Sequence, residues 1–295
     1  MILVTGATGR IGRRVVEALV AAHCPVRVLV RNRDKANNLL PPGVEIFEGD
    51  LAEYDQVEPA VEGAESVLLL SPVAPEQVQI QGNLVKAAIA ISQPYIVKVS
   101  GLGTSLDSYI DSGRWHAETE QQIIESGLAY TFLRPLFFFQ NLTFLLESAR
   151  SNGTIKAGVG DAKIAMVDVE DIAQVAAILL MKQDLLLNQA VSLTSLKSVT
   201  YKEVANAFTE VLGRKVQYEK QSLEDVRRAL QSTNQPQWHI DILLQFNRAF
   251  HEGYGDAANT VVADLLGRPP VTLLQYLKRE SEQSTADNGS NPFPS

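Results

Sequence analysis

The sequence is poor in cysteine: Cys24 is the only one among 295 residues. A single cysteine excludes an internal disulfide and a metal site built from several cysteines, which fits a reducing compartment. Long apolar runs are also missing, because no stretch reaches the roughly 18 residues that a membrane helix needs. The first residues have the pattern of a strand rather than that of a signal peptide. We therefore expect a cytoplasmic protein without a membrane span.

Clusters of positive charge are absent as well. The chain carries 26 Lys and Arg against 34 Asp and Glu, a formal net charge of -8. Nucleic-acid binding needs concentrated positive charge on one face, so nucleic acid is not an expected partner. Two of the few histidines, His239 and His251, have no companions at metal-ligand spacing, and we expect no metal.

What the chain does contain is a regular alternation of short apolar runs and helical patterns. The predicted helices span 11–22, 35–39, 54–61, 76–92 and 114–126. The predicted strands are "ILVTG", "VRVLVR", "VEIFEGD", "SVLLLSP", "YIVKVSG" and "AYTFLRP". This alternation predicts a parallel sheet flanked by helices, with strands buried on both faces. The predicted fold class is α/β, a doubly wound parallel sheet with a smaller, interleaved C-terminal α+β region.

The pattern changes after Asn141, which sets the predicted domain bounds. The first domain covers 1–141, and 164–194 return to it. The second region covers 142–163 and 195–280, with a further helix predicted over 169–181 in the returning segment. The last residues, 281–295, are polar, contain Gly and Pro and lack periodicity, so we predict that they are disordered.

Three glycines, Gly6, Gly9 and Gly12, stand at three-residue intervals between the first strand and the first helix. Without side chains, the backbone turns tightly and approaches a pyrophosphate closely, while the helix N-terminus attracts the phosphates. The alternative is an ordinary strand-to-helix turn. The agreement of strand, spacing and helix favours dinucleotide binding. The other predicted contacts in this loop are Thr8, Arg10 and Ile11.

The end of the second strand distinguishes the two common dinucleotides. An acidic residue there accepts from the ribose 2′-hydroxyl of NAD, whereas an arginine accommodates the 2′-phosphate of NADP. The chain reads "VRVLVRNRDK", so Arg31 and Arg33 favour NADP(H) over the alternative of two solvated strand-end residues. Asp50, followed by Leu51, ends the third strand and is placed to meet the adenine. Its alternative role is to cap the following helix.

Several segments together carry a family resemblance. They are "VTGATGRIG", "EGDLAE", "VKVSGLGT", "WHAETEQQIIESGLAYTFLRP" with "FFFQN", and "VDVEDIA". The ordered set resembles the NmrA-like atypical short-chain dehydrogenases, which include quinone oxidoreductases, triphenylmethane dye reductases and NADP-sensing regulators. The resemblance spans about residues 1 to 280. It implies an NAD(P)-binding Rossmann domain with a small C-terminal substrate region over the nicotinamide end.

Typical short-chain dehydrogenases place Tyr-x-x-x-Lys on the helix after the fifth strand. The corresponding segment here is His116-Ala-Glu-Thr-Glu120. His116 and Glu120 share one helix face, and a carboxylate there is expected to stabilise protonated imidazole. The resemblance therefore suggests His116 as a catalytic residue without supporting a ketone-reductase mechanism. Tyr109 is a substitute acid or, alternatively, a packing residue.

Further candidates lie at strand ends. Lys98 interrupts an apolar strand, where contact with the nicotinamide ribose and burial against a carboxylate are both open alternatives. Ser100 ends this strand where the family's catalytic serine would be sought, or it is a turn residue. The other predicted cofactor contacts are Ser71, Pro72 and Pro135. The predicted substrate contacts are Phe137, Phe138 and Asn141, although at least two of the phenylalanines 137–139 are expected in the core.

The predicted function is an NADPH-dependent oxidoreductase that transfers hydride to a quinone-like or other conjugated small-molecule acceptor. Such acceptors give stabilised products, so the protein mainly needs to orient the nicotinamide and exclude water. The alternatives are a non-catalytic NADP(H)-sensing regulatory protein and a scaffolding factor. The expected partner is the small-molecule electron acceptor, and homodimer formation is left open.

Overall fold

The computed structural model describes residues 1–286, and its backbone forms two compact units. The first unit consists of Met1–Pro135, Val169–Leu193 and Asp264–Gly267. The second consists of Leu136–Asp168, Thr194–Ala263 and the described residues from Arg268 to Ala286. Because these units are defined by backbone contacts and not by ligands, the division into cofactor and substrate regions stays a prediction.

A seven-stranded parallel sheet forms the centre of the first unit, in the order β10-β6-β5-β4-β1-β2-β3. Its inner strands are buried along their whole length because the helices cover both faces. The predicted doubly wound fold is confirmed. The strands are β1 (Ile2–Thr5), β2 (Val26–Val30), β3 (Glu45–Glu48), β4 (Ser66–Leu69), β5 (Tyr95–Val99), β6 (Tyr130–Pro135) and β10 (Gln189–Leu193).

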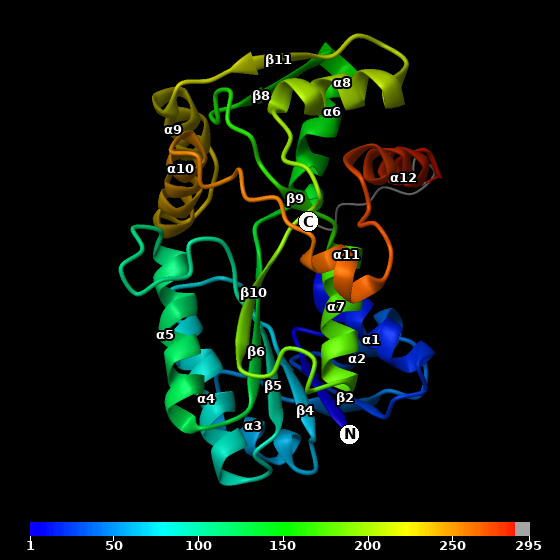
Figure 1. Ribbon diagram of the computed structural model, residues 1–295, viewed down its shortest axis with the longest axis vertical. Coiled ribbons are helices and arrows are strands. Elements are labelled where there is room, and N and C mark those ends of the chain that lie inside the picture. The colour runs from blue at the N-terminus through cyan, green and yellow to red at the C-terminus, as the bar shows by residue number, and fades with distance from the viewer. Residues whose placement is uncertain (287–295) are drawn as a thin grey trace. The chain divides into compact units, whose positions relative to one another are not determined.

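The helices of the first unit form two layers. Helix α1 packs beside α7 on one face, and α3, α4 and α5 pack in succession on the other (Figure 1). The amphipathic spacing of apolar residues in α1 buries Val15, Val16 and Leu19 against the sheet. The helices are α1 (Arg10–Ala21), α2 (Arg33–Leu39), α3 (Tyr54–Val61), α4 (Gln77–Ala90), α5 (Asp111–Ser126) and α7 (Val169–Met181).

The strand order reverses at β1, which lies between β2 and β4. In such sheets the two neighbouring loops diverge and leave a crevice at the carboxyl ends of the strands. A side chain ties these ends together: Thr5 Oγ1 donates to the carbonyl of Leu70 at 2.8 Å and accepts from its amide at 2.9 Å. The glycine loop therefore starts at a fixed point on the carboxyl edge.

The second unit contains two short parallel strand pairs, β7 (Phe137–Phe138) with β9 (Met166–Val167) and β8 (Thr154–Ala157) with β11 (Gln217–Lys220). The fully buried carboxylate of Asp168 pairs with Arg279 at 2.6 Å, which ties the last helix to this unit. The helices here include η1 (Phe139–Leu142), α6 (Thr143–Asn152), α8 (Tyr201–Leu212), α9 (Leu223–Gln231), α10 (Gln237–His251) and α12 (Leu273–Ala286), and α11 (Val261–Leu266) is shared between the units.

One prediction about the C-terminus needs correction. Helix α12 continues to Ala286, so the predicted disorder from residue 281 is wrong for 281–286, where a polar sequence continues an anchored helix. The rest of that prediction, 287–295, lies outside the described residues. Within the described part of the chain, no helix is long and apolar enough to cross a membrane.

Gly12 is the tightest position of the glycine loop, which gives a prediction about stability. A Cβ atom on Gly12 would lie 2.2 Å from the carbonyl oxygen of Gly6, whereas one on Gly9 would lie 3.2 Å from that oxygen. We expect Gly12→Ala to lower the free energy of unfolding by about 1–3 kcal/mol, because the helix must move off the loop. Gly9→Ala should cost clearly less in the same urea titration. Equal losses of unfolding free energy in the two variants would show that the backbone at Gly6 moves easily to make room for a side chain at position 12.

Candidate active site

The glycine loop forms an open helix N-terminus at the carboxyl edge of the first unit. Gly6 has a φ of 63°, and the amide of Gly9 donates to the carbonyl of Gly6 at 3.0 Å. Gly9 is the N-cap residue of α1, makes no side-chain cap and is exposed, and the first turn carries no acidic residue. The first amides of α1 thus lack side-chain acceptors, as an anion site requires. Around them, Arg10 is exposed, Thr8 is half-buried and Ile11 is buried.

The two arginines after β2 differ in their surroundings. Arg31 is exposed, and its guanidinium forms no hydrogen bond or ion pair with any residue in 1–286. Arg33 starts α2, and its Nε lies 3.7 Å from Glu48, whose other oxygen accepts from the Arg33 amide at 3.2 Å. Arg31 is therefore the freer cation for a 2′-phosphate, and Glu48 on β3 partly neutralises Arg33.

Asp50 organises the loop after β3. Its Oδ1 accepts from the amide of Ala52 at 2.9 Å, and its own amide donates to Gln56 at 2.8 Å. Helix α3 has Glu53 as its N-cap residue, so the alternative of Asp50 as the helix cap is wrong. The carboxylate of Asp50 instead bonds within the turn that precedes this N-cap residue. Leu51 next to it is half-buried.

Two buried amide oxygens near the end of β4 have no hydrogen-bond partner in the described chain. Gln77 and Gln81 are both fully buried on α4, one helical turn apart. Gln81 donates through Nε2 to Ser71 Oγ at 2.9 Å, and Gln77 Nε2 lies 2.9 Å from Nδ1 of His116. The Oε1 atom of each glutamine is unpartnered. Buried acceptors without donors are costly, so this edge suits a ligand with hydroxyl or amide donors. Pro72 beside them is exposed.

The charged residues of β5, α5 and β6 form a buried polar cluster. Lys98 Nζ donates to Ser100 Oγ at 2.9 Å, and it lies 3.0 Å from Nδ1 of His116. Ser100 Oγ donates in turn to Glu120 at 2.6 Å. Glu120 pairs with Arg134 through two nitrogens of the guanidinium. The structure therefore joins three predicted site residues, Lys98, Ser100 and His116, in one network.

The pKa of His116 is shifted in the direction opposite to the one expected from a carboxylate one helical turn away. Burial first, and then the charges of Lys98 and Arg134, hold the pKa of His116 well below its usual range. Glu120 does not stabilise an imidazolium, because its carboxylate is bound by Arg134 and Ser100. The expectation that this carboxylate would favour protonated imidazole is therefore wrong, and the imidazole is neutral at pH values near 7.

Lys98 is the least exposed charged group of the cluster, at 0% relative exposure. Burial, opposed by the charge of Glu120 and assisted by that of Arg134, lowers the pKa of its ammonium to about 7. The network thus supplies a lysine beside the residue at the tyrosine position, but the lysine comes from β5 rather than from α5. Of the two alternatives for Lys98, burial is observed, with Ser100 standing between it and the carboxylate.

Gln77 and Arg134 were not among the predicted site residues. A signal for Arg134 exists in the sequence, because it is a charge inside the apolar run "TFLRP", as Lys98 is in "IVKVS". Tyr109 lies half-buried in the loop before α5, and Pro135 is buried at the end of β6. Their predicted roles stay predictions.

The predicted substrate contacts belong to the second unit. Phe137 packs edge-on against Phe250, with ring centroids 5.5 Å apart. Phe138 and Asn141 are half-buried, and Phe139 is buried against Tyr276. At least two of the three phenylalanines were expected in the core, and this expectation is wrong: only Phe139 belongs to the buried core, because Phe137 and Phe138 on the short strand β7 are half-buried.

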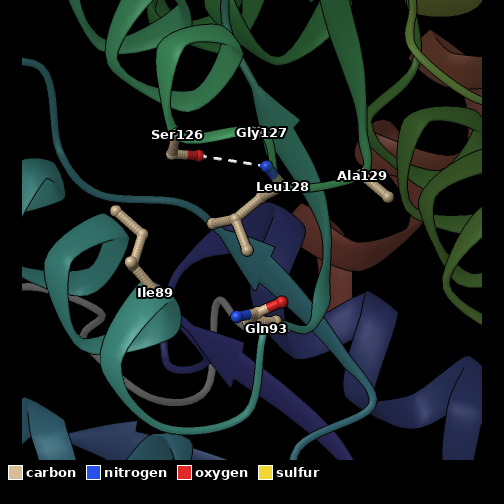
Figure 2. Close-up of a pocket in the computed structure, with 6 residues that line it drawn as sticks. All are labelled: Ile89, Gln93, Ser126, Gly127, Leu128 and Ala129. Atoms are coloured by element: carbon tan, nitrogen blue, oxygen red, sulfur yellow. Dashed lines mark hydrogen bonds between the residues drawn. The ribbon is translucent and has the colours of Figure 1, made fainter.

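A cavity of about 260 Å³ lies at the other edge of the sheet, and Figure 2 shows the residues that line it. It is lined by Ile89 and Gln93 at the end of α4 and by residues 126–129, which lead into β6. Figure 2 shows Ser126 bonding to the amide of Leu128 within this wall. These residues precede β5 and β6, so the cavity is at the amino ends of the strands, away from the glycine loop and the polar cluster.

Comparison of the chain with known proteins shows its family. Residues 1–277 match the model of the NmrA-like family. An NAD(P)H azoreductase from Xenophilus azovorans is 34% identical over 278 residues, which cover 94% of this chain and 97% of that protein. Both chains are thus aligned over nearly their full length.

Solved structures agree with the sequence comparison. An NADPH-dependent quinone oxidoreductase from Escherichia coli, in complex with NADPH, superposes with a TM-score of 0.87 at 27% identity, covering 95% of this chain and 99% of that one. The Citrobacter sp. triphenylmethane reductase with NADP(H) gives 0.83 at 26%, with the same coverage. NmrA, a negative transcriptional regulator, gives 0.79 at 17% identity over 98% of each chain, which shows the fold alone.

A doubly wound sheet with an open glycine loop and a buried Lys–His cluster at one edge defines the class, an oxidoreductase of the atypical short-chain dehydrogenase type. Within that class, the chain belongs to the NmrA-like family. The family resemblance and the oxidoreductase class inferred from the sequence are both confirmed.

The lowered pKa of Lys98 predicts a pH dependence of stability. Between about pH 7 and 10.5 the unfolded lysine keeps a proton that the folded one has lost. The unfolded state then binds more protons, so the free energy of unfolding rises with pH in this window, by up to about 1.4 kcal/mol per pH unit. Urea titrations at several pH values should show wild type gaining stability relative to Lys98→Met. A pH-independent difference would mean that Lys98 titrates normally.

Proposed function

We propose that the protein is an NADPH-dependent reductase that transfers hydride to a quinone-like or other conjugated small-molecule acceptor. The observation that carries this proposal is the position of a neutral, buried His116 at the same sheet edge as the open glycine loop. NADP(H) is the cofactor, and the residues of the first unit fit it, because the glycine positions leave backbone where a Cβ atom would obstruct the phosphates.

Each part of this edge suits one part of the cofactor. The first turn of α1 would hold the pyrophosphate, Arg31 the 2′-phosphate, and Asp50 with Leu51 the adenine side. The unpartnered oxygen of Gln81 beside Ser71 would accept from a ribose hydroxyl. When bound, NADPH supplies the hydride. The remaining proposed cofactor contacts are Gly6, Thr8, Gly9, Arg10, Ile11, Gly12, Arg33, Pro72 and Pro135. Lys98, which was also predicted to contact the cofactor, is fully buried and is assigned to the polar cluster instead.

The acceptor class follows from what the site offers. No Tyr-x-x-x-Lys pair stands on α5, and quinones, azo dyes and dye cations yield stabilised products without one. His116, with Ser100 and Tyr109, is the proposed catalytic group, and Phe137, Phe138 and Asn141 are the proposed acceptor contacts. The small-molecule acceptor is the proposed partner, and homodimer formation stays a prediction.

Turnover tests the proposal directly. The purified protein is mixed with NADPH and a panel of quinones, azo dyes, triarylmethyl dyes and enones, and the absorbance of reduced nicotinamide is followed. We expect sustained oxidation of NADPH with at least one acceptor class. Tight NADPH binding without turnover of any acceptor would contradict the reductase and favour the alternative, a non-catalytic NADP(H) sensor.

Arg31 gives a separate prediction on cofactor choice. Because its guanidinium has no partner among the described residues, Arg31→Ala should raise the Kd for NADPH by about 10- to 100-fold, the value of one or two charged hydrogen bonds. The Kd for NADH should hardly change. Calorimetric titrations measure both, and Arg33→Ala is the matched comparison. Its loss should be smaller, because Glu48 already pairs with Arg33. Equal effects on NADPH and NADH would refute the assignment.

A further inference from the structure

We propose that Lys98 is a positioning residue that holds His116 as the Nε2–H tautomer and passes it a proton at Nδ1 when Nε2–H protonates the reduced acceptor. This proposal rests on the proposed reductase function. It assigns the proton of the reaction to a pair of residues from two elements, β5 and α5, that the chain brings together only on folding.

The backbone places the pair. Lys98 lies on β5 and Ser100 directly follows its last residue, so the two are two residues apart and point to the same side of the extended chain. His116 and Glu120 are four residues apart on α5 and share one face of that helix. The contacts are 3.0 Å from Lys98 Nζ to His116 Nδ1 and 2.9 Å from Nζ to Ser100 Oγ. Strand and helix therefore meet through their polar faces.

The partners of His116 determine its tautomer. The protonated ammonium of Lys98 has only donors to offer, so Nδ1 must accept and the ring hydrogen must be on Nε2. The side-chain amide of Gln77 adds a second donor to Nδ1 at 2.9 Å. Nε2 has no hydrogen-bond partner within the described chain. A Cβ atom at Gly101 would lie 3.6 Å from Nε2, so glycine leaves the space beside this donor unfilled.

The charges around the pair make the lysine proton transferable. The groups facing Lys98 are His116 and Glu120 on α5 and Arg134 on β6. Arg134 binds the carboxylate of Glu120 directly, and Ser100 Oγ stands between that carboxylate and the ammonium. No carboxylate in the described residues is within ion-pair distance of Lys98. A buried ammonium without a direct counter-ion gives up its proton more easily than an exposed one.

His116 and Lys98 supply the proton that the reduction of a quinone by hydride requires. The quinone takes the hydride, with its two electrons, and becomes a hydroquinone anion. The anion takes the proton from Nε2 of His116, while Nδ1 takes a proton from Lys98. The products are the hydroquinone, NADP⁺, an imidazole with its hydrogen on Nδ1, and a neutral lysine amine. A proton from solvent at Nε2, with return of the Nδ1 proton to Lys98, restores the starting state.

Gln77 provides an acceptor for the intermediate tautomer. Its Oε1 is buried and unpartnered while Nε2 faces His116. A half-turn of the amide exchanges the two atoms, so that Oε1 accepts the new Nδ1–H. The unpartnered oxygen, which is a cost in the resting state, thus gains its hydrogen bond after proton transfer.

The relay predicts that two kinds of acceptor behave differently. A quinone needs hydride and a proton, whereas a triarylmethyl cation needs hydride only and becomes a neutral product. We expect Lys98→Met to lower kcat for the quinone about 10- to 100-fold more than kcat for the dye, as the loss of general-acid assistance does. In wild type, kcat for the quinone should fall above about pH 7, and kcat for the dye should not follow this fall. Lys86→Met, the same change at an exposed position of α4, should alter neither.

A nitrogen-15 NMR spectrum of the histidine rings tests the tautomer without turnover. His116 is assigned from the signals missing in His116→Gln. In wild type, its Nε2 should carry the hydrogen, and its Nδ1 shift should titrate with the midpoint of Lys98, near pH 7. In Lys98→Met the titration of the Nδ1 shift should vanish. If this variant folds poorly, the wild-type spectrum alone still shows which ring nitrogen carries the hydrogen.

The outcomes separate the relay from the reductase. Equal loss of quinone and dye turnover in Lys98→Met, or a hydrogen on Nδ1 of resting wild-type His116, overturns the relay and leaves the reductase standing. If wild type reduces neither acceptor, the proposed function fails, and the relay to an acceptor fails with it.

Discussion

The burial of one ammonium group, that of Lys98, is the constraint on which the candidate active site depends. A fully buried lysine is expensive unless its hydrogens are accepted, and here the acceptors are Ser100 Oγ and His116 Nδ1. Because Nδ1 of His116 accepts from the lysine, the ring hydrogen of the imidazole is on Nε2, which keeps this nitrogen available as a donor. Burial of the imidazole, together with the charges of Lys98 and Arg134, holds its pKa low. The carboxylate that could have neutralised the lysine directly is instead held by Arg134. The site therefore contains a neutral histidine next to a weakly held proton.

The fold brings this cluster to the place where the chemistry needs it. In a parallel sheet, all strands end at the same edge, so β1 with its glycine loop and β5 with Lys98 share one rim although they are far apart in the sequence. The contact of Thr5 with Leu70 joins the ends of β1 and β4, and α4 and α5 supply Gln77, Gln81 and His116 from the flanking layer. The cavity lined by Ile89, Gln93 and residues 126–129 lies at the opposite edge of the sheet, at the amino ends of the strands.

Much of the fold could be predicted from the sequence, because its strands are continuous apolar runs and its helices are strongly periodic. Helices α3 and α7 begin and end at the predicted residues. Helix α5 begins three residues earlier than predicted, where Gly113 packs against the backbone of Gly103, a tertiary contact that periodicity does not encode. The glycine loop and Arg31 could also be predicted, because their proposed roles follow from the residues next to them in the sequence. The residues of the polar cluster could be predicted only one by one. The spacing within α5 indicated that Glu120 would be the charged partner of His116. The observed partner is Lys98, because the packing of β5 against α5 brings its side chain to the imidazole.

The central claim is that this edge of the first unit transfers hydride from NADPH to a conjugated acceptor. Transfer of a labelled hydrogen measures this most directly: the protein is mixed with NADPH carrying deuterium at the reactive position of the nicotinamide and with a triarylmethyl dye in ordinary water. The experiment is run with NADPH deuterated on each face of the nicotinamide in turn, and the reduced dye is analysed by mass spectrometry and proton NMR. The account predicts deuterium at the central carbon of the product with one of the two forms. Reduced dye that carries only solvent hydrogen with both forms, or dye that stays unreduced, would contradict it.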